Sequence, residues 1–355
     1  MDATYDGDLV RADRRAREQF YDARGYGRPD DGGVALDPVE AAHLLFRGDL
    51  DAVVDRRAGG GDRLDFRSFL ASTAVSEVEF FVYKDLRDRG FYLSPTRESR
   101  VADTTGDFAV YPRGKGPWDD TTAYRVRAVS ERAAIAAREM QSLAAVDGDG
   151  TGVLAVVDEE SEVTYLEVDS PTITGSTHHS LPAIEGDLLA DRVLVWDPPV
   201  ELHERAFYGQ QLDQEGDAVQ LSLVEAAYLA SQGKLTVDDG RSGGEATVVE
   251  RGRDVEGERF DRRLRVYSAL RTAGVVPKTG FKFGADFRTY ADVADVDHLG
   301  HSELLVRVLP TDHAFAPRDL ALDVRLAHGV RKRMVFALTG ANEGIDWLSA
   351  SRLTP

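Results

Sequence analysis

The sequence predicts an α/β (α+β) fold built by tandem duplication, in which each copy has a small N-terminal α/β unit followed by a unit with a mixed sheet. Three observations support this prediction. Segments of the first half recur in the second half in the same order. Stretches with apolar residues at helical spacing alternate with short apolar runs of strand length. The chain has 355 residues and is 42 % hydrophobic, which is enough for the cores of two to four compact units.

Four matched stretches define the duplication. Tyr26 matches Tyr208 at an offset of 182 residues, and the VEAA at 39–42 matches the VEAA at 224–227 at an offset of 185. Two later matches, VYKDLRDRG with VYSALRTAG and DFAVY with DFRTY, have offsets of 184 and 179. Chance is a poor explanation for four matches at nearly the same offset. Both copies are therefore expected to fold into the same two units.

The matched segments also set the domain boundaries. The predicted parts are residues 1–72 and 73–168 of the first copy, a linker over 169–184, and residues 185–256 and 257–355 of the second copy. The linker is polar and lacks periodicity, which favours a loop. We interpret its adjacent His178 and His179 as solvated loop residues, because no third metal ligand lies nearby in the sequence.

Within the last unit, the elements follow from local pattern. Apolar residues at helical spacing predict a helix over 260–270, and Gly274 is a helix stop signal. Residues 304–309 predict a strand. Pro317 suits the first turn of a helix, and the apolar run 334–338 fits a buried strand. This alternation predicts a mixed sheet covered by helices.

Composition excludes several classes of function. The chain has no Cys, so disulfides, Cys-ligated zinc and thiol nucleophiles are ruled out. No stretch approaches the roughly 18 apolar residues that span a bilayer, and the N-terminus has no basic-then-apolar signal pattern. We therefore expect a cytoplasmic protein with no membrane partner.

Charge is unevenly distributed along the chain. The formal net charge is −19, and only 6 of the 43 basic residues are Lys. An acidic, Lys-poor composition is typical of a halophilic protein in molar salt, where charges are screened within about 3 Å. Residues 251–355 carry 17 Lys and Arg against 14 Asp and Glu, a net charge of +3, which leaves −22 for residues 1–250. The C-terminal third is thus the part suited to face phosphates.

That same third holds three residues suited to acid–base chemistry on a phosphodiester. Tyr290 ends a predicted strand, His301 precedes another, and Lys332 lies at a predicted helix-to-strand junction. Metal-free RNA cleavage must deprotonate the ribose 2′-OH, protonate the leaving 5′-oxygen and stabilise the charge that builds on phosphorus. Spacing alone does not exclude a noncatalytic role for each residue: Tyr290 could be a packing residue, His301 a structural one and Lys332 a solvated one.

Longer motifs around these residues narrow the choice. The segments GFKFGADFRTY, HSELLVRV and VRLAHGVRKRMVFA, in this order, resemble the catalytic-domain signature of archaeal-type tRNA-splicing endonucleases (tRNA-intron endonucleases). The pattern YG followed by LSLVEAAYLASQGKL is similar to the family's N-terminal domain. The resemblance covers about residues 186–355 and, more faintly, the first copy. It implies a nuclease-like fold for the second unit of each copy and the two-repeat homodimeric form of the enzyme.

The resemblance also implies roles for the site residues. Tyr290 would act as general base, His301 as general acid and Lys332 as stabiliser of the transition state. The expected substrate is precursor tRNA with a bulge-helix-bulge at its intron–exon junctions. The expected products are a 2′,3′-cyclic phosphate and a 5′-hydroxyl, formed with no metal and no cofactor.

Two further residues are implied in RNA binding. Family members hold a bulged base between two flat side chains, and the matching positions are Arg325 and Trp347. A guanidinium plane and an indole can stack on any base. The alternative for Trp347 is a core aromatic residue.

The first copy has lost most of the catalytic set. It keeps Tyr111, but Thr121 aligns with His301 and Gly150 aligns with Lys332. We expect this copy to be structural and to hold the partner's catalytic unit in a homodimer, using the acidic turn at residues 158–160.

Two other functions remain as alternatives. One is a noncatalytic RNA-binding scaffold subunit of the same fold. The other is a metal-dependent DNA endonuclease, which would require clustered carboxylates with a Lys at one sheet edge. The sequence shows no such cluster, and the complete set of Tyr290, His301 and Lys332 argues against a scaffold.

Overall fold

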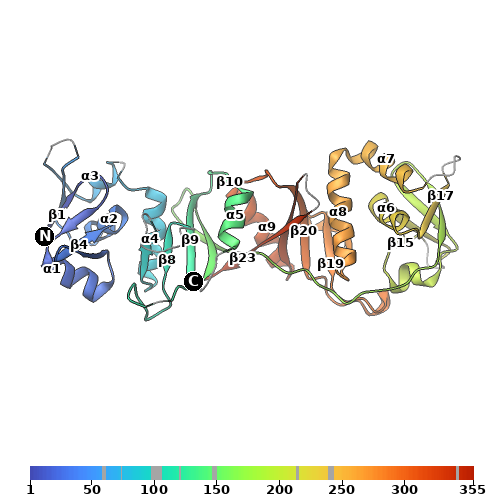
Figure 1. Cartoon of the computed structure of the whole chain (residues 1–355), viewed down its shortest axis with the longest axis horizontal. Coiled ribbons are helices and arrows are strands. Elements are labelled where there is room, and N and C mark those ends of the chain that lie inside the picture. Colours follow the sequence, from blue (N-terminus) through green and yellow to red (C-terminus); the bar gives the residue numbers. More distant parts are fainter. Residues whose placement is uncertain are drawn as a thin grey trace. The chain divides into compact units, whose positions relative to one another are not determined.

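The computed structural model describes residues 1–57, 61–72, 74–96, 106–119, 121–145, 150–212, 216–238, 244–340 and 344–355. The chain divides into two compact units. The first consists of Met1–Asp169, Ala314–Leu322 and Ala350–Pro355, and the second of Ser170–His313 and Asp323–Ser349. Helices and strands alternate along both units, and the sheets are mixed (Figure 1), so the predicted α/β class is confirmed.

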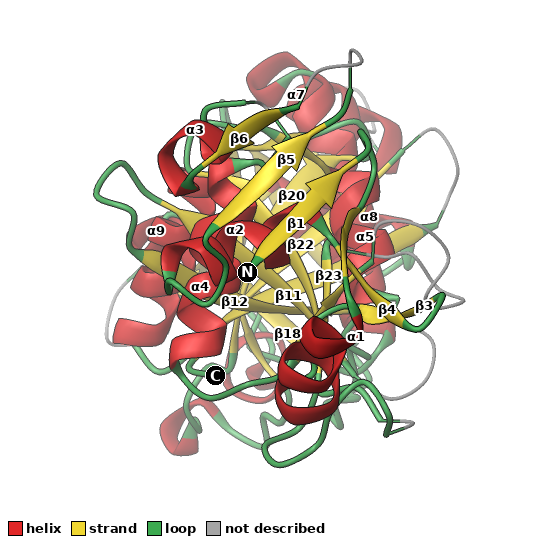
Figure 2. Ribbon diagram, turned by 90° about the vertical axis from the view of Figure 1, so that its left-hand side faces the viewer, coloured by secondary structure: helices red, strands yellow, loops and turns green. Residues whose placement is uncertain are grey.

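The first unit begins with a small sheet of order β3-β4-β2-β1-β5-β6. Its strands are β1 (Asp2–Tyr5), β2 (Val10–Ala12), β3 (Arg28–Asp30), β4 (Gly33–Leu36), β5 (Ala52–Asp55) and β6 (Asp62–Leu64). Strands β1 and β5 run parallel, as Figure 2 shows, whereas β1–β2 and β2–β4 are antiparallel. The helical elements are α1 (Arg14–Ala16), the π-helical η1 (Arg17–Asp22), α2 (Pro38–Phe46) and α3 (Phe66–Leu70).

The second unit begins with a sheet of the same pairing, β15-β16-β14-β13-β17. Its strands are β13 (Ile184–Leu188), β14 (Arg192–Trp196), β15 (Gln210–Gln211), β16 (Ala218–Ser222) and β17 (Leu235–Asp238). Strands β13 and β17 are parallel and β14 and β16 are antiparallel, which repeats the arrangement of the first copy. The helical elements are the π-helical η2 (Glu201–Arg205), α6 (Leu223–Ser231) and α7 (Glu245–Glu256).

Helices α2 and α6, which correspond to each other in the two copies, begin in the same way. Helix α2 begins with a capping box of Asp37 and Glu40, and α6 begins with one of Ser222 and Glu225. In each copy the Glu also accepts a backbone N–H from a glycine in the left-handed region, at 2.8 Å from Gly27 and 2.9 Å from Gly209. A Cβ at Gly209 would lie 2.4 Å from the Gln220 oxygen, so this tight turn requires glycine.

The following part of the first unit holds another mixed sheet. Its elements are α4 (Glu77–Asp88), β7 (Leu93–Pro95), β8 (Phe108–Val110), β9 (Tyr124–Ser130), β10 (Ile135–Ala136), α5 (Ala137–Ala144), β11 (Thr151–Val157) and β12 (Val163–Asp169). Strands β9 and β11 are parallel, and the other pairs, β7–β8, β8–β9 and β11–β12, are antiparallel.

The C-terminal part repeats this plan. Its elements are α8 (Glu258–Thr272), β18 (Val276–Thr279), the 3-10 helix η3 (Phe281–Phe283), β19 (Phe287–Tyr290), the 3-10 helix η4 (Val296–His298), β20 (Leu304–Pro310), β21 (Ala314–Phe315), α9 (Pro317–Gly329), β22 (Arg333–Thr339) and β23 (Ile345–Leu353). Strands β20 and β22 are parallel, like β9 and β11, and β18–β19 and β19–β20 are antiparallel. Of the residues at helical spacing in α8, Phe260, Tyr267 and Leu270 are buried and Leu264 is partly buried.

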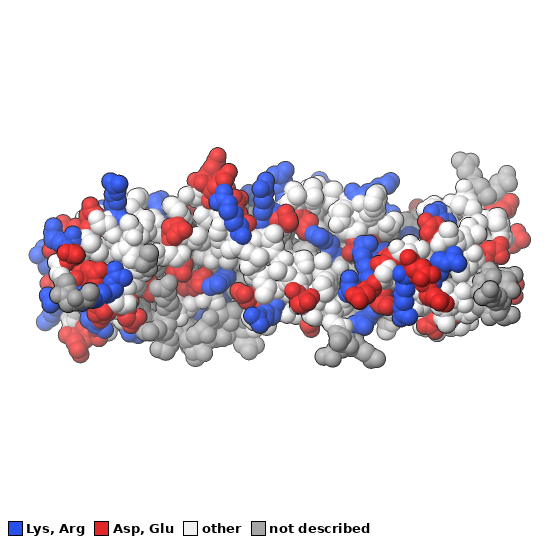
Figure 3. Space-filling view, turned by 90° about the horizontal axis from the view of Figure 1, so that it is seen from above, with Lys and Arg blue, Asp and Glu red and all other residues white. Residues whose placement is uncertain are grey.

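Charged side chains cover much of the surface. On the face drawn in Figure 3, acidic and basic side chains are interspersed. Several form exposed ion pairs, such as Arg253 with Asp261 at 3.0 Å. Such pairs contribute little individually, about 0–1 kcal/mol, and less in concentrated salt. Among the described residues, no helix is long and apolar enough to cross a membrane.

Candidate active site

Three strand ends meet at one edge of the C-terminal sheet. The Glu303 N–H donates to the Thr289 oxygen at 3.0 Å, and the Arg333 N–H donates to the Glu303 oxygen at 3.0 Å. Tyr290 follows Thr289, and Lys332 precedes Arg333. These bonds therefore bring the end of β19, the loop before β20 and the start of β22 side by side.

His301 and Lys332 line a hollow of about 920 Å³ at this edge. The described residues that line it are His301, Ser302, Glu303, Leu304, His328, Gly329, Arg331, Lys332 and Arg333. The Lys332 Nζ donates to the Ser302 carbonyl oxygen at 2.8 Å, which ties the lysine to the residue after His301. The structure thus brings two of the three predicted catalytic residues together around a space that can hold a ligand.

The turn between α9 and β22 sets the position of Lys332. Arg331 adopts the left-handed region with φ 57°, and the Lys332 N–H donates to the Ala327 oxygen at 2.9 Å. This bond closes the C-terminus of α9 and directs the chain into β22. Burial lowers the pKa of Lys332 from its usual value, and the nearby Arg288 guanidinium lowers it further.

Tyr290 is mostly buried beside the hollow and is not part of its lining. Its side chain is 7 % exposed and packs with Val276 and Val293. The Phe207 ring lies edge-on to it, with ring centroids 5.7 Å apart. The Arg288 guanidinium carbon lies 5.8 Å from the Tyr290 ring centroid. The backbone places Tyr290 next to the other two residues, while its ring belongs to a small apolar cluster.

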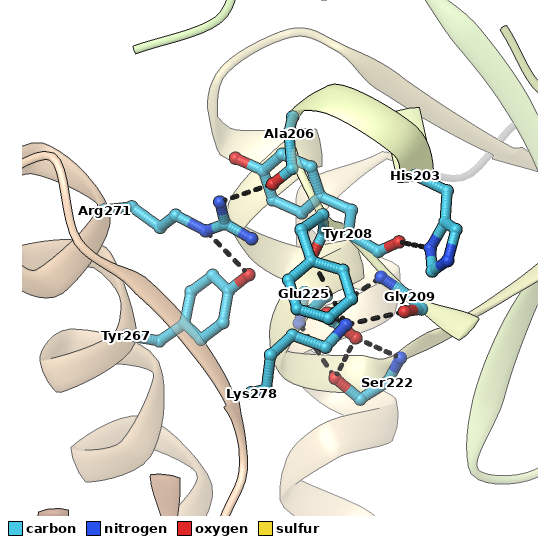
Figure 4. Close-up of polar contacts among 10 residues, drawn as sticks. His203, Ala206, Tyr208, Gly209, Ser222, Glu225, Tyr267, Arg271 and Lys278 are labelled. Carbon is cyan, nitrogen blue, oxygen red and sulfur yellow. Dashed lines mark hydrogen bonds and ion pairs between the residues drawn. The ribbon is translucent and has the colours of Figure 1, made fainter. Parts of the chain in front are cut away.

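A buried ion pair that the sequence did not predict, Lys278 with Glu225 (Figure 4), is linked to this cluster through Phe207. The Lys278 Nζ lies 3.4 Å from a Glu225 oxygen and donates to the Gly209 and Phe207 oxygens at 2.6 and 3.2 Å. Both side chains are 9 % exposed. Lys278 therefore fixes the turn that carries Phe207, the ring packed on Tyr290.

Burial and pairing act in opposite directions on these two charges. Burial alone would raise the pKa of Glu225, but Lys278 and the N–H donors of Ser222 and Gly209 outweigh it and lower the pKa. Burial lowers the pKa of Lys278, and Glu225 offsets part of this effect. Each charge is thus retained because of the other.

Comparison with known protein families connects this geometry with a function. Residues 260–347 match the family described as "tRNA intron endonuclease, catalytic C-terminal domain". Residues 1–70 and 184–248 match "tRNA intron endonuclease, N-terminal domain". The chain belongs to the tRNA intron endonuclease family. It is therefore an endoribonuclease of tRNA splicing, and the family and enzyme class predicted from the sequence are confirmed.

Similar proteins cover the whole endonuclease chain. The tRNA-splicing endonuclease of Haloarcula marismortui is 62 % identical over 100 % of both chains. That of Natronomonas pharaonis is 59 % identical over 98 % of both. That of Methanosarcina mazei is 39 % identical over 98 % of this chain and 97 % of its own. The haloarchaeal relatives agree with the halophilic character that the acidic, Lys-poor composition predicted.

The two residues predicted to stack on a base lie on different elements of the endonuclease. Arg325 is exposed on α9. Trp347 is half-buried on β23 and packs against the hydrophobic core of the second unit. Trp347 therefore combines a core contact with an accessible part, and its role in RNA binding stays a prediction.

The first copy of the endonuclease keeps the backbone of the site but lacks the His and Lys side chains. The Ala123 N–H donates to the Val110 oxygen at 2.8 Å, and the Thr151 N–H donates to the Ala123 oxygen at 2.9 Å. Thr121 stands three residues before β9, as His301 stands three before β20, and Gly150 directly precedes β11, as Lys332 precedes β22. The alignment that placed Thr121 and Gly150 thus agrees with the structure.

The acidic turn of the endonuclease connects β11 and β12. Asp158 accepts the N–H groups of Glu160 and Glu162, both at 2.9 Å, so its carboxylate holds the turn together. Glu159 is exposed and pairs with Arg132 at 2.5 Å. Asp158 therefore has a local structural role, whereas Glu159 and Glu160 present charge to the solvent.

Metal-binding donors are not gathered at the site. Within the described ranges, no group of three or more His, Asp or Glu side chains is arranged to hold a metal ion. His298 and His301 are both exposed in the loop before β20.

Proposed function

We propose that this endonuclease cleaves precursor tRNA at both intron–exon junctions, at a bulge-helix-bulge, without a metal ion. Tyr290 acts as general base, His301 as general acid and Lys332 as stabiliser of the charged phosphorus centre. The observation that supports this proposal best is the hollow shared by His301 and Lys332, at the sheet edge where Tyr290 ends its strand. The enzyme works in the cytoplasm, at high salt.

The chemistry needs no external electron or oxidant. Tyr290 accepts the proton of the ribose 2′-OH, whose oxygen attacks the adjacent phosphorus. The bond from phosphorus to the 5′-oxygen breaks, and His301 gives a proton to that oxygen. Lys332 faces the negative charge on the phosphoryl oxygens. The products are a 2′,3′-cyclic phosphate and a 5′-hydroxyl.

A cleavage assay with end-group analysis tests the function. An intron-containing precursor tRNA should be cut at both junctions in the presence of EDTA, leaving cyclic phosphate and 5′-hydroxyl ends. Loss of cleavage with EDTA and its return with Mg²⁺ would favour a metal-dependent nuclease. Binding without any cleavage would favour the scaffold function.

We predict that Arg325 and Trp347 recognise the bulge. Replacing both by Ala should weaken binding of bulged RNA much more than binding of a paired duplex, because base stacking contributes about 1–3 kcal/mol per base. Filter binding on the two RNAs measures the difference. Because Trp347 also packs on the core, Trp347→Phe is the control that keeps this contact. Equal losses on both RNAs would mean that the residues only support the fold.

We also predict a homodimer that uses the acidic turn. One chain carries one complete catalytic set, and an intron has two ends to cut. Two chains related by a two-fold axis would present two sites at a fixed separation. The acidic first copy would contact the more basic C-terminal part of the partner. Light scattering at high salt should give twice the 38.9 kDa mass of one chain.

The variant that tests this contact should spare Asp158, which holds the turn together. Glu159→Gln with Glu160→Gln removes the exposed charges and should weaken the dimer. Arg132→Gln is the matched control, because it removes the partner of Glu159 within the chain. A wild-type mass near that of one chain, or a double variant as tightly dimeric as wild type, contradicts the arrangement.

A further inference from the structure

A second hollow in the second unit is separate from the catalytic one. It has a volume of about 270 Å³ and lies between the linker residues 177–180 on one side and Ala206, Tyr208, Tyr228 and Arg271 on the other. The described residues of its lining include no Asp or Glu. Donor groups of an arginine, two histidines and several hydroxyls therefore surround a space larger than a phosphate group.

Arg271, on α8, is the charged residue of this hollow. Only 9 % of the residue is exposed. Its Nε donates to the Tyr267 hydroxyl at 3.0 Å, and its Nη1 donates to the Ala206 oxygen at 2.9 Å (Figure 4). The guanidinium carbon stacks 3.8 Å from the Tyr208 ring centroid. Among the described residues, Nη2 has no hydrogen-bond partner although it is buried.

The buried groups around Arg271 leave a positive charge uncompensated. The cations Arg271 and Lys278 and the carboxylate Glu225 are all buried, and Figure 4 shows how they lie. Glu225 is engaged by Lys278 at 3.4 Å and by the N–H groups of Gly209 and Ser222. Within the described part of the chain, the hydrogen-bond acceptors of Arg271 are the neutral oxygens of Tyr267 and Ala206, and its guanidinium also lies over the Tyr208 and Tyr267 rings. Glu225 acts on it without a direct ion pair. A buried cation with an unpaired N–H favours a bound anion.

The linker forms a fixed rim of the hollow. The N–H groups of Gly175 and Thr177 donate to the Ala273 and Gly274 oxygens at 2.8 and 2.9 Å. A His179 ring nitrogen lies 3.2 Å from the Val293 oxygen. The linker is thus a loop with exposed histidines, as the sequence indicated, and its backbone is held against the end of α8 and the chain after Tyr290. His178 and Ser180 are exposed at the rim.

We propose that this hollow is a binding site for a phosphate-like oxyanion, with Arg271 at its base and linker residues 177–180 at its rim. The anion is either free in solution or a backbone phosphate of the bound RNA, since both present the same oxygen acceptors. Bound there, it joins the linker to α8. It thereby also steadies residues 291–293, to which the linker is hydrogen-bonded directly after Tyr290.

The test is calorimetric titration of the full chain with inorganic phosphate, exchanged against chloride at constant ionic strength. Wild type should bind one phosphate per chain. His178→Glu places a carboxylate beside Arg271 and should weaken phosphate binding by about 10- to 100-fold, the weight of a charge-assisted hydrogen bond. His178→Gln introduces a neutral side chain of the same size as Glu, and this variant should bind phosphate as wild type does.

Two arginine variants separate this site from general surface charge. Arg271→Met should abolish the binding. Arg87→Met is the matched control and should bind phosphate as wild type does. Arg87 stacks 3.8 Å from the Tyr26 ring, donates to the Arg24 oxygen and also has a buried N–H without a partner among the described residues, but it lies in the first copy and not in the lining of this hollow. If Arg271→Met does not fold, the comparison of His178→Glu with His178→Gln tests whether phosphate binds in this hollow. No saturable binding by wild type, or equal binding by His178→Glu and His178→Gln, overturns the proposal.

Cleavage kinetics identify the source of the anion. If an RNA phosphate fills the site, inorganic phosphate should raise the KM of wild type and leave that of His178→Glu unchanged. If a free anion fills it, phosphate should bind without changing KM. Both kinetic outcomes presuppose that phosphate binds in the calorimetric titration. That titration is made without RNA, so its result does not depend on the proposed cleavage function.

Discussion

Replacing His301 by Ala should lower the rate of precursor-tRNA cleavage by about 10²–10⁴-fold, the usual loss when a general acid is removed. His301 is exposed in the loop before β20, so its removal leaves no cavity in the core. Folding and RNA affinity should therefore stay close to wild type, and the loss should appear in kcat. Single-turnover cleavage measured together with RNA binding separates the two.

Two control variants make this result specific. His298→Ala removes another exposed imidazole three residues away in the same loop and should cleave at the wild-type rate. Tyr111→Phe, at the counterpart of Tyr290 in the first copy, should also be silent in catalysis, although it removes a hydrogen bond to Ser94. A His301→Ala enzyme that cuts as fast as wild type would disprove the assignment.

Variants of Lys332 and His301 should lose similar cleavage activity but respond differently to a substrate with a better leaving group. Lys332→Met keeps most of the side-chain stem and loses both the charge and the bond to the Ser302 oxygen. Its cleavage rate should fall to a similar extent. A substrate whose 5′-oxygen is replaced by sulfur, a better leaving group, should restore cleavage by His301→Ala more than by Lys332→Met, because only the general acid becomes dispensable.

The sequence predicted those parts of the fold that depend on local pattern. Apolar spacing located α8, Pro317 marked the first residue of α9, and the apolar run from Met334 lies within β22. Aligning the two copies also placed Thr121 and Gly150 correctly at the positions of His301 and Lys332. These predictions were correct because helical periodicity and internal repeats can be recognised from the order of residues along the chain.

The sequence could not predict the buried charges. Lys278 and Arg271 carry side chains that are usually exposed, and no spacing rule links Lys278 to Glu225, 53 residues earlier. The linker is a loop with exposed histidines, as its polar sequence predicted, but its backbone bonds to residues about 100 positions away could not be predicted, because they depend on tertiary packing. Tyr290 shows the same limit, since neither motif nor spacing indicates that its ring is buried beside Phe207.

Breaking the Lys278–Glu225 pair should destabilise the second unit strongly. Lys278→Met leaves the Glu225 carboxylate buried without its counter-charge, which typically costs about 3–5 kcal/mol. The double variant Lys278→Met with Glu225→Gln should be more stable than Lys278→Met alone, because no unpaired charge remains buried; the Gln amide oxygen can still accept the Gly209 N–H, whereas the bond from the Ser222 N–H is lost. Denaturant unfolding of the single and double variants measures this coupling.

The exposed pair of Arg253 and Asp261, at 3.0 Å, provides the matched control for this cycle. Asp261→Asn should change stability by less than about 1 kcal/mol, because water screens both charges. Loss of Lys278 should also affect cleavage, since it releases the turn at Phe207 that supports the Tyr290 ring. The pair would be dispensable if Lys278→Met unfolded like Asp261→Asn, or if the double variant lost the sum of both single losses. In that case apolar packing of Phe207 alone would have to position Tyr290.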